Sequence, residues 1–271
     1  MLPSLLSLSV LGCSSGYLRE QAKDLEEVYG MQLVRSGTYT IGCTEGQEDR
    51  CTDAEPLREV TLTQPYLIGE TEVTQELYVS IMDRNPSLDT TCGERCPVEG
   101  VSWYDAVRFA NEVSAAHGLP QCYSIDDTLV ELTRGLHCGG FRLPTEAEWE
   151  VAARGGQDLM YSGSNNAHDV AWFGEHPLGG IHPVGRKQPN AYGLYDMSGN
   201  VLEWAWDTYR EDPPSAANDP VVEDGTRRVV RGGNWRNDHT IVRVSTRYGR
   251  NPESGGAVSG LRLVLAAPPV E

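Results

Sequence analysis

The sequence predicts a single domain of mixed α/β (α+β) class in which regular secondary structure is scarce. Its 29 glycines and 16 prolines make up about a sixth of the 271 residues, which favours many loops and few long helices. No long helix start signal occurs after Gly156, where loops and short strand patterns fill the chain. No internal repeat and no strong linker follows residue 30, so we expect one domain over residues 31–271.

Capping residues predict three helices, which begin after Thr74, Ser102 and Thr145. The second and third starts carry an acidic residue three positions later, as in a capping box, and each helix runs into glycine. Runs rich in threonine, valine, tyrosine and isoleucine precede these helices at residues 33–41 and 59–62. Such runs are typical of short strands.

Further short strands separated by loops are expected. The segment between Cys122 and Cys138 has the pattern of a hairpin, and residues 229–235 form a strand pattern with a Gly-Gly bend. Two further apolar runs, at residues 242–246 and 261–265, are predicted to be closing strands.

Charge excludes one class of function. The formal net charge is −17, and Lys23 and Lys187 are the only lysines. Non-specific nucleic-acid binding needs basic surface that displaces counterions, so no nucleic-acid partner is expected. An acidic surface favours solubility, and it would also tolerate Ca²⁺ nearby.

The seven cysteines divide into one at position 13 and six that form neighbouring pairs. The pairs are Cys43 with Cys51, Cys92 with Cys96, and Cys122 with Cys138. Six cysteines allow 15 connectivities, but each neighbouring pair would close a short polar loop, so we expect three local disulfides and an oxidising compartment. Zinc is disfavoured because no histidine lies near the first two pairs.

The N-terminus has the features of an export signal. Residues 1–16 hold a short apolar run, too short to span a bilayer, that ends at Gly12-Cys13. Val10 to Cys13 resembles a bacterial lipobox, which implies a lipid on Cys13, although the usual basic n-region is missing. Residues 17–30 would then be a tether, and the protein would lie in the bacterial cell envelope, either outer membrane or periplasm. A plain secretory leader or a frayed terminus is the alternative.

The stretch from Tyr192 to Trp204 is apolar and rich in turn residues, as in an ordered loop of the core. It holds two carboxylates, Asp196 and Glu203. Glu203 could pair with a buried arginine such as Arg142 or Arg231, while Asp196 caps a turn.

Six sequence blocks carry a resemblance to a known family. They are Gly69–Thr74, Pro97–Trp103, Arg142–Glu150, Tyr192–Trp204, Arg231–Gly233 and Gly260–Arg262. In this order they resemble the formylglycine-generating enzyme family, also called sulfatase-modifying factors, over residues 31–266. The resemblance implies a compact α/β fold of low regular content with a C-type-lectin-like core.

The family's reactive centre is altered in this chain. The resemblance implies oxidation of a sulfatase cysteine by O₂ and copper, with the copper on a cysteine pair, since copper(I) prefers thiolates. Here Asn237 stands at the first of those cysteines and no cysteine follows Cys138. Asn234 and Leu202 replace the family's pocket serine and tryptophan, and His239 is the one acid–base side chain nearby. No copper is expected.

The resemblance also implies a structural Ca²⁺ site in the central stretch. Its ligands would be the side chains of Asp196 and Glu203 and the backbone carbonyls of Gly199 and Val201. A hard cation of this kind prefers several oxygen ligands on a flexible turn. A second family site near Asp169 lacks a carboxylate in its partner loop.

These observations leave two functions open. The first is a repurposed module without copper that binds a protein or small-molecule ligand, or acts as a scaffold, on the cell envelope, touching the membrane only through a lipid on Cys13. The alternative is a divergent modifying oxidoreductase of the same family, acting on siderophore precursors or sulfatases.

Overall fold

The computed structural model describes residues 29–43, 51, 55–176, 178–215 and 217–267. The expected signal segment, Cys13 and nearly all of the expected tether therefore lie outside the described residues. Among the helices that are described, none combines the length and the apolar character needed to cross a membrane.

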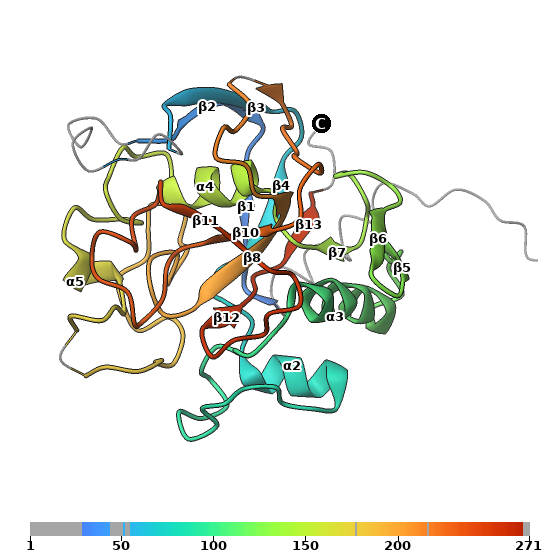
Figure 1. Ribbon diagram of the computed structural model, residues 1–271, viewed down its shortest axis with the longest axis horizontal. Helices are drawn as coiled ribbons and strands as arrows, with labels where there is room; N and C mark the ends of the chain where they lie inside the picture. The colour runs from blue at the N-terminus through green and yellow to red at the C-terminus, as the bar shows by residue number, and fades with distance from the viewer. Residues whose placement is uncertain (1–28, 44–50, 52–54, 177, 216, 268–271) are drawn as a thin grey trace, which may run out of the picture.

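Two four-stranded sheets form the centre of the molecule (Figure 1). The first has the order β1-β4-β13-β7 and is antiparallel throughout; its strands are Met31–Val34, Tyr66–Gly69, Val264–Ala266 and Phe141–Arg142. The second has the order β11-β10-β8-β12; its strands are Arg247–Arg250, Arg228–Arg231, Leu202–Thr208 and Ser259–Gly260. Strand β8 begins within the stretch Tyr192–Trp204 and is buried at every residue.

Smaller sheets lie around these two. Strands β2 (Gly37–Ile41), β3 (Arg58–Leu62) and β9 (Ala217–Asn218) form a three-stranded sheet. Strands β5 (Tyr123–Asp126) and β6 (Leu129–Leu132) form the hairpin expected between Cys122 and Cys138.

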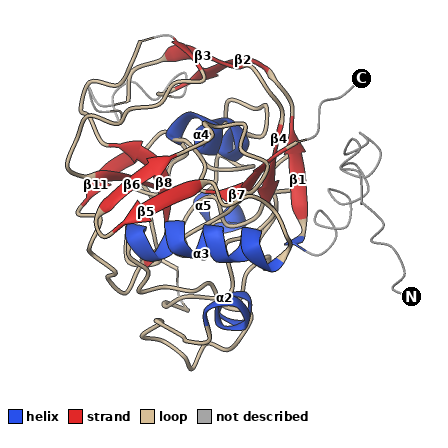
Figure 2. Cartoon of the chain, turned by 90° about the vertical axis from the view of Figure 1, so that its right-hand side faces the viewer, coloured by secondary structure: helices blue, strands red, loops and turns tan. Residues whose placement is uncertain are grey.

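The three predicted helices are present, together with a short fourth helix. They are α2 (Gln75–Met82), α3 (Trp103–Ala116), α4 (Glu146–Arg154) and α5 (Ala167–Val170). Thr74 caps α2, and Ser102 and Thr145 each make the expected capping box at the starts of α3 and α4. Figure 2 shows α2 below α3, and α4 between the β2–β3 sheet and the central strands.

Helix α4 is unusual because it is charged and yet buried at all nine residues. Its carboxylates pair with arginines of three strands: Glu146 with Arg247 of β11, Glu148 with Arg142 of β7, and Glu150 with Arg231 of β10. Burial alone would raise the pKa of Glu146 and Glu150, but these arginines lower it, so both carboxylates stay ionised. The helix is thus fixed by ion pairs as well as by apolar packing.

The disulfide prediction is confirmed for all three pairs. Cys43 is bonded to Cys51, Cys92 to Cys96, and Cys122 to Cys138. Cys122 and Cys138 are buried in the main apolar cluster with the α3 side chains Trp103 and Phe109.

The prediction of a strand over residues 242–246 is wrong: these residues form turns, and strand β11 begins only at Arg247. The apolar side chains of Val242 and Val244 are buried as the pattern indicated. However, the carbonyls of Val244, Ser245 and Thr246 all accept hydrogen bonds from the guanidinium of Arg231, at 2.8, 3.1 and 2.8 Å. In a strand, successive carbonyls point to opposite sides. Here three successive carbonyls converge on one guanidinium, so the segment forms a turn. The expected strand over residues 261–265 is also displaced, to Val264–Ala266.

Candidate functional site

Glu203 pairs with a buried arginine, which was one of the two interpretations of its role. The arginine is Arg262 rather than Arg142 or Arg231. Both carboxylate oxygens accept hydrogen bonds from Arg262, at 2.7 to 3.1 Å, and Oε2 also accepts from the indole of Trp149 at 2.7 Å. Glu203 and Arg262 are both about 1% exposed or less, so this is a fully buried ion pair. It joins β8 to the segment before β13.

Asp196 lies beside this pair in a positive-φ turn, with φ +56°. Its Oδ2 accepts a hydrogen bond from the backbone N–H of Gly185 at 2.7 Å, and its Oδ1 is buried without a partner among the described residues. Burial raises the pKa of Asp196 to about 6. Burial, followed by the charges of Asp196 and Glu203, also raises the pKa of Glu72, which accepts from Asn200 and Val201.

The four residues expected to bind calcium do not fit the ion in this arrangement. Asp196 offers one free oxygen, but both oxygens of Glu203 are used by Arg262 and Trp149. A cation bound to Glu203 would also lie next to the positive charge of Arg262. Calcium at Asp196, Gly199, Val201 and Glu203 stays a prediction that requires Arg262 to give up these contacts.

Calcium removal tests this point directly. We expect the melting temperature of EGTA-treated protein to be unchanged when millimolar Ca²⁺ is added, because Arg262 already neutralises Glu203. An ion present at a hundredfold excess over its Kd would stabilise the fold by about 2.7 kcal/mol. That corresponds to a rise of roughly 5–10 °C for a domain of this size. Calorimetry with Mg²⁺ as control checks it, and a rise specific to Ca²⁺ would establish the family site.

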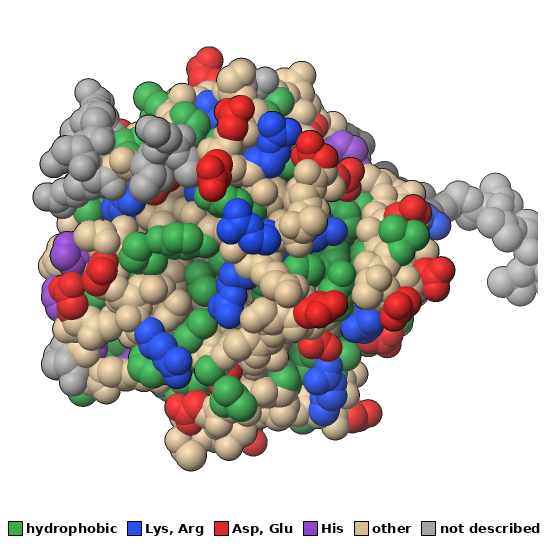
Figure 3. Space-filling model, in the orientation of Figure 1, with side chains coloured by type: hydrophobic (Ala, Val, Ile, Leu, Met, Phe, Trp, Pro, Cys, Tyr) green, Lys and Arg blue, Asp and Glu red, His purple; other side chains and the backbone are tan. Residues whose placement is uncertain are grey.

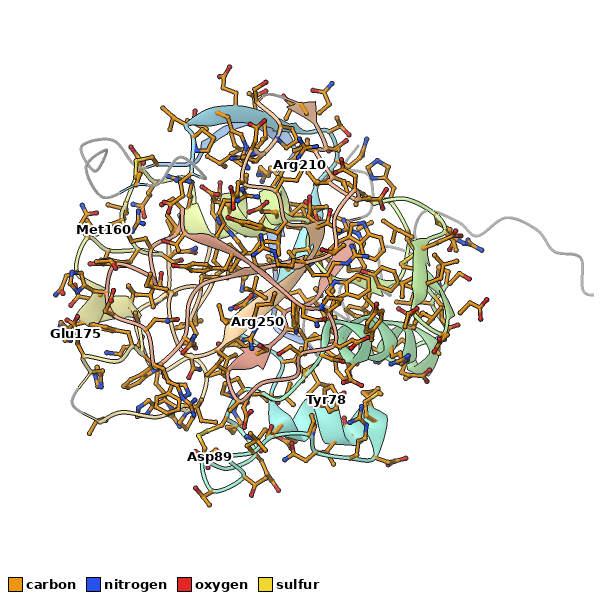
Figure 4. The ribbon with its side chains drawn as sticks, viewed as in Figure 1. Tyr78, Asp89, Met160, Glu175, Arg210 and Arg250 are labelled. Atoms are coloured by element: carbon orange, nitrogen blue, oxygen red, sulfur yellow. A yellow bond between two sulfur atoms is a disulfide. The ribbon has the colours of Figure 1, made fainter. Side chains whose placement is uncertain are left out.

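The residues at the altered reactive centre lie in three different environments. Asn234 and Asn237 come together: Asn237 Oδ1 accepts from the amide Nδ2 and the backbone N–H of Asn234, at 2.6 and 3.0 Å. Leu202 is buried in the main apolar cluster. His239 is exposed and pairs with Glu175 at 2.9 Å, and Figure 4 shows Glu175 at the edge of the molecule beside α5.

This arrangement does not suit copper. Asn237, which the resemblance places at a family cysteine, presents an amide oxygen that already accepts hydrogen bonds from Asn234. The six cysteines of the described chain are all in disulfides and present no thiolate. Copper(I) binds soft thiolates far better than amide oxygens, so no step can be assigned to copper at these residues.

A cavity of ≈ 310 Å³ adjoins the asparagine pair, because Trp235 and Arg236 lie between the two asparagines and line it. Its full lining is Leu88, Asp89, Glu99, Ile181, Trp235, Arg236 and Ala257. Asp89 is on the loop that follows α2, at the bottom of the view in Figure 4. The cavity thus lies between residues 88–99 and the segment that holds Asn234 and Asn237.

Two polar atoms of the cavity-lining residues are buried and have no hydrogen-bond partner among the described residues. They are the carboxylate Oε2 of Glu99 and the indole Nε1 of Trp235. Buried polar groups are usually paired, so these two atoms are exceptions to the usual pattern. Sequence reasoning missed both residues, although an acidic residue in the apolar run Pro97-Val98-Glu99-Gly100-Val101 was a visible signal.

Two larger cavities are less informative. One of ≈ 500 Å³ is lined by Tyr29 and Gly30, and one of ≈ 650 Å³ by Cys43. Both therefore adjoin segments outside the described residues. On the face in Figure 3, basic side chains are interspersed with acidic ones rather than gathered into one patch.

Comparison with known proteins identifies the family. A model of the sulfatase-modifying factor enzyme 1-like domain matches residues 18–267. The chaperone protein LppX of Paenibacillus barcinonensis is 36% identical over 240 residues, which are 76% of this chain and 82% of LppX. The formylglycine-generating enzyme of Thermomonospora curvata is 33% identical over 193 residues, and the match spans 61% of this chain and about half (54%) of that enzyme.

Solved structures agree with the sequence comparison. Treponema denticola variable protein 1 superposes with a TM-score of 0.79 at 33% identity, covering 88% of this chain and 95% of that protein. These similarities confirm the expected mixed α/β fold of low regular content. The chain therefore belongs to the sulfatase-modifying factor enzyme 1-like family, that of the formylglycine-generating enzymes.

Proposed function

We propose that this chain is a ligand-binding domain that works without copper and uses the cavity beside Asn234 and Asn237. One observation carries the proposal. At the position that the resemblance assigns to the family's reactive centre, Asn234 donates a hydrogen bond to Asn237, and a cavity lined by Trp235 and Arg236 adjoins this pair. A cavity of this kind can hold a ligand, and the centre beside it presents no thiolate for copper chemistry.

The proposed location is the bacterial cell envelope, with anchoring through a lipid on Cys13. Three disulfides support an oxidising compartment, because such bonds rarely persist in a reducing cytosol. The ligand is proposed to be a small molecule or part of a protein. A partner protein would agree with the similarity to LppX, which is named a chaperone. No nucleic acid is proposed as a partner, since the net charge is −17.

The catalytic alternative is tested with a peptide that carries the cysteine motif of sulfatases. We expect no conversion of its cysteine to formylglycine when the purified protein is supplied with copper and O₂. Mass spectrometry of the peptide is the measurement, and the Thermomonospora curvata enzyme is the positive control. Conversion would overturn the proposal and favour a divergent modifying oxidoreductase.

Binding itself is tested by a thermal-shift screen of small polar molecules on the native protein and on Trp235→Phe. The substitution keeps an aromatic ring and removes the unpartnered N–H donor. The proposal expects compounds that raise the melting temperature of the native protein but not that of the variant. A screen without any compound that depends on Trp235 argues against it.

A further inference from the structure

Arg228 and Arg250 are cross-strand neighbours in the second sheet. Strands β10 and β11 are antiparallel, and their register places Arg228 directly opposite Arg250. The side chains of such a pair leave the sheet on the same face, with Cβ atoms about 5 Å apart. Like charges in this arrangement repel each other and destabilise the sheet. A negative charge bound between the two arginines would remove this repulsion.

The guanidinium of Arg250 is held in place by neutral groups. Its Nη1 donates to the hydroxyl of Ser259 at 2.7 Å, and its Nη2 donates more weakly to the hydroxyl of Ser254 at 3.4 Å. Gly256 lets the loop lie against it, because a Cβ at that position would be 2.9 Å from Nη2. Figure 4 shows Arg250 near the centre of its view, beside β12. The side chain is partly exposed, so its remaining N–H groups are available to a ligand.

The guanidinium of Arg228 lies against aromatic rings rather than a carboxylate. Its Cζ is 3.7 Å from the ring centroid of Trp103 and 5.0 Å from that of Trp206, and its Nη1 donates to the backbone carbonyl of Trp206 at 2.6 Å. Cation–π contacts stabilise a guanidinium but leave its charge in place. Arg228 is also partly exposed. It therefore adds a second accessible cation to that of Arg250.

Acidic side chains do not neutralise this pair. Among the described residues, neither guanidinium takes part in an ion pair. Burial lowers the pKa of both arginines; at Arg250 no acidic group opposes this effect, and at Arg228 the charges of Asp207 and Glu223 oppose it only in part. Asp207 is buried, and its two oxygens already accept from backbone N–H groups. Glu223 accepts from an indole N–H at 3.2 Å.

The missing counter-charge is not explained by a shortage of carboxylates. The chain carries a net charge of −17, yet these adjacent arginines have no acidic partner. A partly buried charge is costly without a counter-charge. Guanidinium groups present rigid, planar pairs of donors that match the oxygens of phosphate. A carboxylate offers its oxygens in one plane, whereas a tetrahedral oxyanion directs them several ways and can bridge guanidinium groups from two strands.

We propose that Arg228 and Arg250 form a binding site for a tetrahedral oxyanion, namely a phosphate or sulfate group. Both guanidinium groups donate charge-assisted hydrogen bonds to its oxygens, and the hydroxyl of Ser254 adds a neutral donor. The site is distinct from the cavity described above, whose lining includes neither arginine. It therefore goes beyond the proposed function and does not depend on it.

Isothermal titration calorimetry with inorganic anions tests the proposal. Sodium phosphate and sodium sulfate are the probes, and sodium acetate at the same ionic strength is the comparison. We expect acetate to bind at least about tenfold more weakly, because it loses a charge-assisted hydrogen bond. Whichever of phosphate and sulfate binds more tightly identifies the preferred group. Binding should weaken as NaCl is added, since partly exposed charges are screened by salt.

Variants of Arg250 localise the binding. Arg250→Met keeps a hydrocarbon stem and removes the charge, so oxyanion affinity is expected to fall about tenfold to a hundredfold. The variant should fold, because it relieves the repulsion from Arg228. Arg250→Lys keeps the charge without the planar fork and should bind with intermediate affinity. It is the second test if Arg250→Met fails to show the native unfolding transition.

The matched control is Arg227→Met, which removes the same charge from the neighbouring residue. Arg227 is exposed, and its Cζ lies 4.9 Å from the ring centroid of Tyr209. That ring packs on the other face of β11, where a Cβ at Gly249 would meet it at 2.7 Å. Because an exposed charge contributes little, the oxyanion affinity of this variant should change by less than about twofold.

Three results would overturn the inference. They are absence of phosphate and sulfate binding by the native protein, equal affinity for acetate, and a loss of affinity in Arg250→Met no greater than that in Arg227→Met. If Arg250→Met does not fold, native oxyanion affinity in Arg250→Lys has the same meaning.

Discussion

Replacing Arg262 by methionine is expected to lower the free energy of unfolding by about 3–5 kcal/mol, the usual cost of breaking a buried ion pair. The guanidinium donates to both oxygens of Glu203 and to the carbonyls of Gly69 and Tyr195. Its loss leaves the Glu203 carboxylate buried without a cation, close to Glu72 and Asp196. Chemical denaturation followed by tryptophan fluorescence gives the measurement.

The matched control is Arg210→Met. Arg210 pairs with Asp224 at 3.1 Å, but the two side chains are 46% and 71% exposed. Exposed pairs contribute at most about 1 kcal/mol, so this variant should unfold almost like the native protein. A loss at Arg262 no larger than that at Arg210 would mean that Glu203 has another counter-charge, for which bound calcium is the first candidate.

Removing the disulfide between Cys122 and Cys138, with alanine at both positions, is expected to cost about 3 kcal/mol. The bond closes a loop with a sequence separation of 16, and a loop of that length constrains the unfolded chain by about this amount. Two alanines also leave small voids in the main apolar cluster, which adds to the loss. The measurement is again chemical denaturation, under non-reducing conditions.

The Cys92–Cys96 disulfide provides the comparison. Its sequence separation is 4, so the same entropy estimate gives about 2 kcal/mol. Cys92 is only partly buried, which makes void formation a smaller contribution there. Equal losses for the two double variants would show that loop length does not control the contribution of these bonds.

Local signals predicted the local structure well. Thr74, Ser102 and Thr145 each cap a helix as expected, because a cap depends on residues within one turn of it. Local pairing also predicted the disulfides. The strand predicted at residues 242–246 was wrong, although its apolar residues are buried. Carbonyls of this segment accept hydrogen bonds from Arg231, which lies more than ten residues earlier, and a local pattern cannot show such a contact.

The site was predicted less well than the fold. Family motifs directed attention to Asn234 and Asn237, which do meet, but they could not show that Arg262 occupies the carboxylate of Glu203 from 59 residues away. Glu99 was missed because a free oxygen is a property of the assembled wall. Its neighbours in the cavity, Ile181 and Trp235, are far apart in sequence.

The buried guanidinium groups explain why the chain has twenty arginines and two lysines. Each of Arg142, Arg231, Arg247 and Arg262 divides its donors between a carboxylate and backbone carbonyls that lie in different directions. A lysine ammonium is a compact donor and cannot span such a set. Lys187 is the one lysine in the described ranges, so an amine-reactive dye that attaches there would lie beside Trp172, whose ring centroid is 4.3 Å from the Lys187 ammonium.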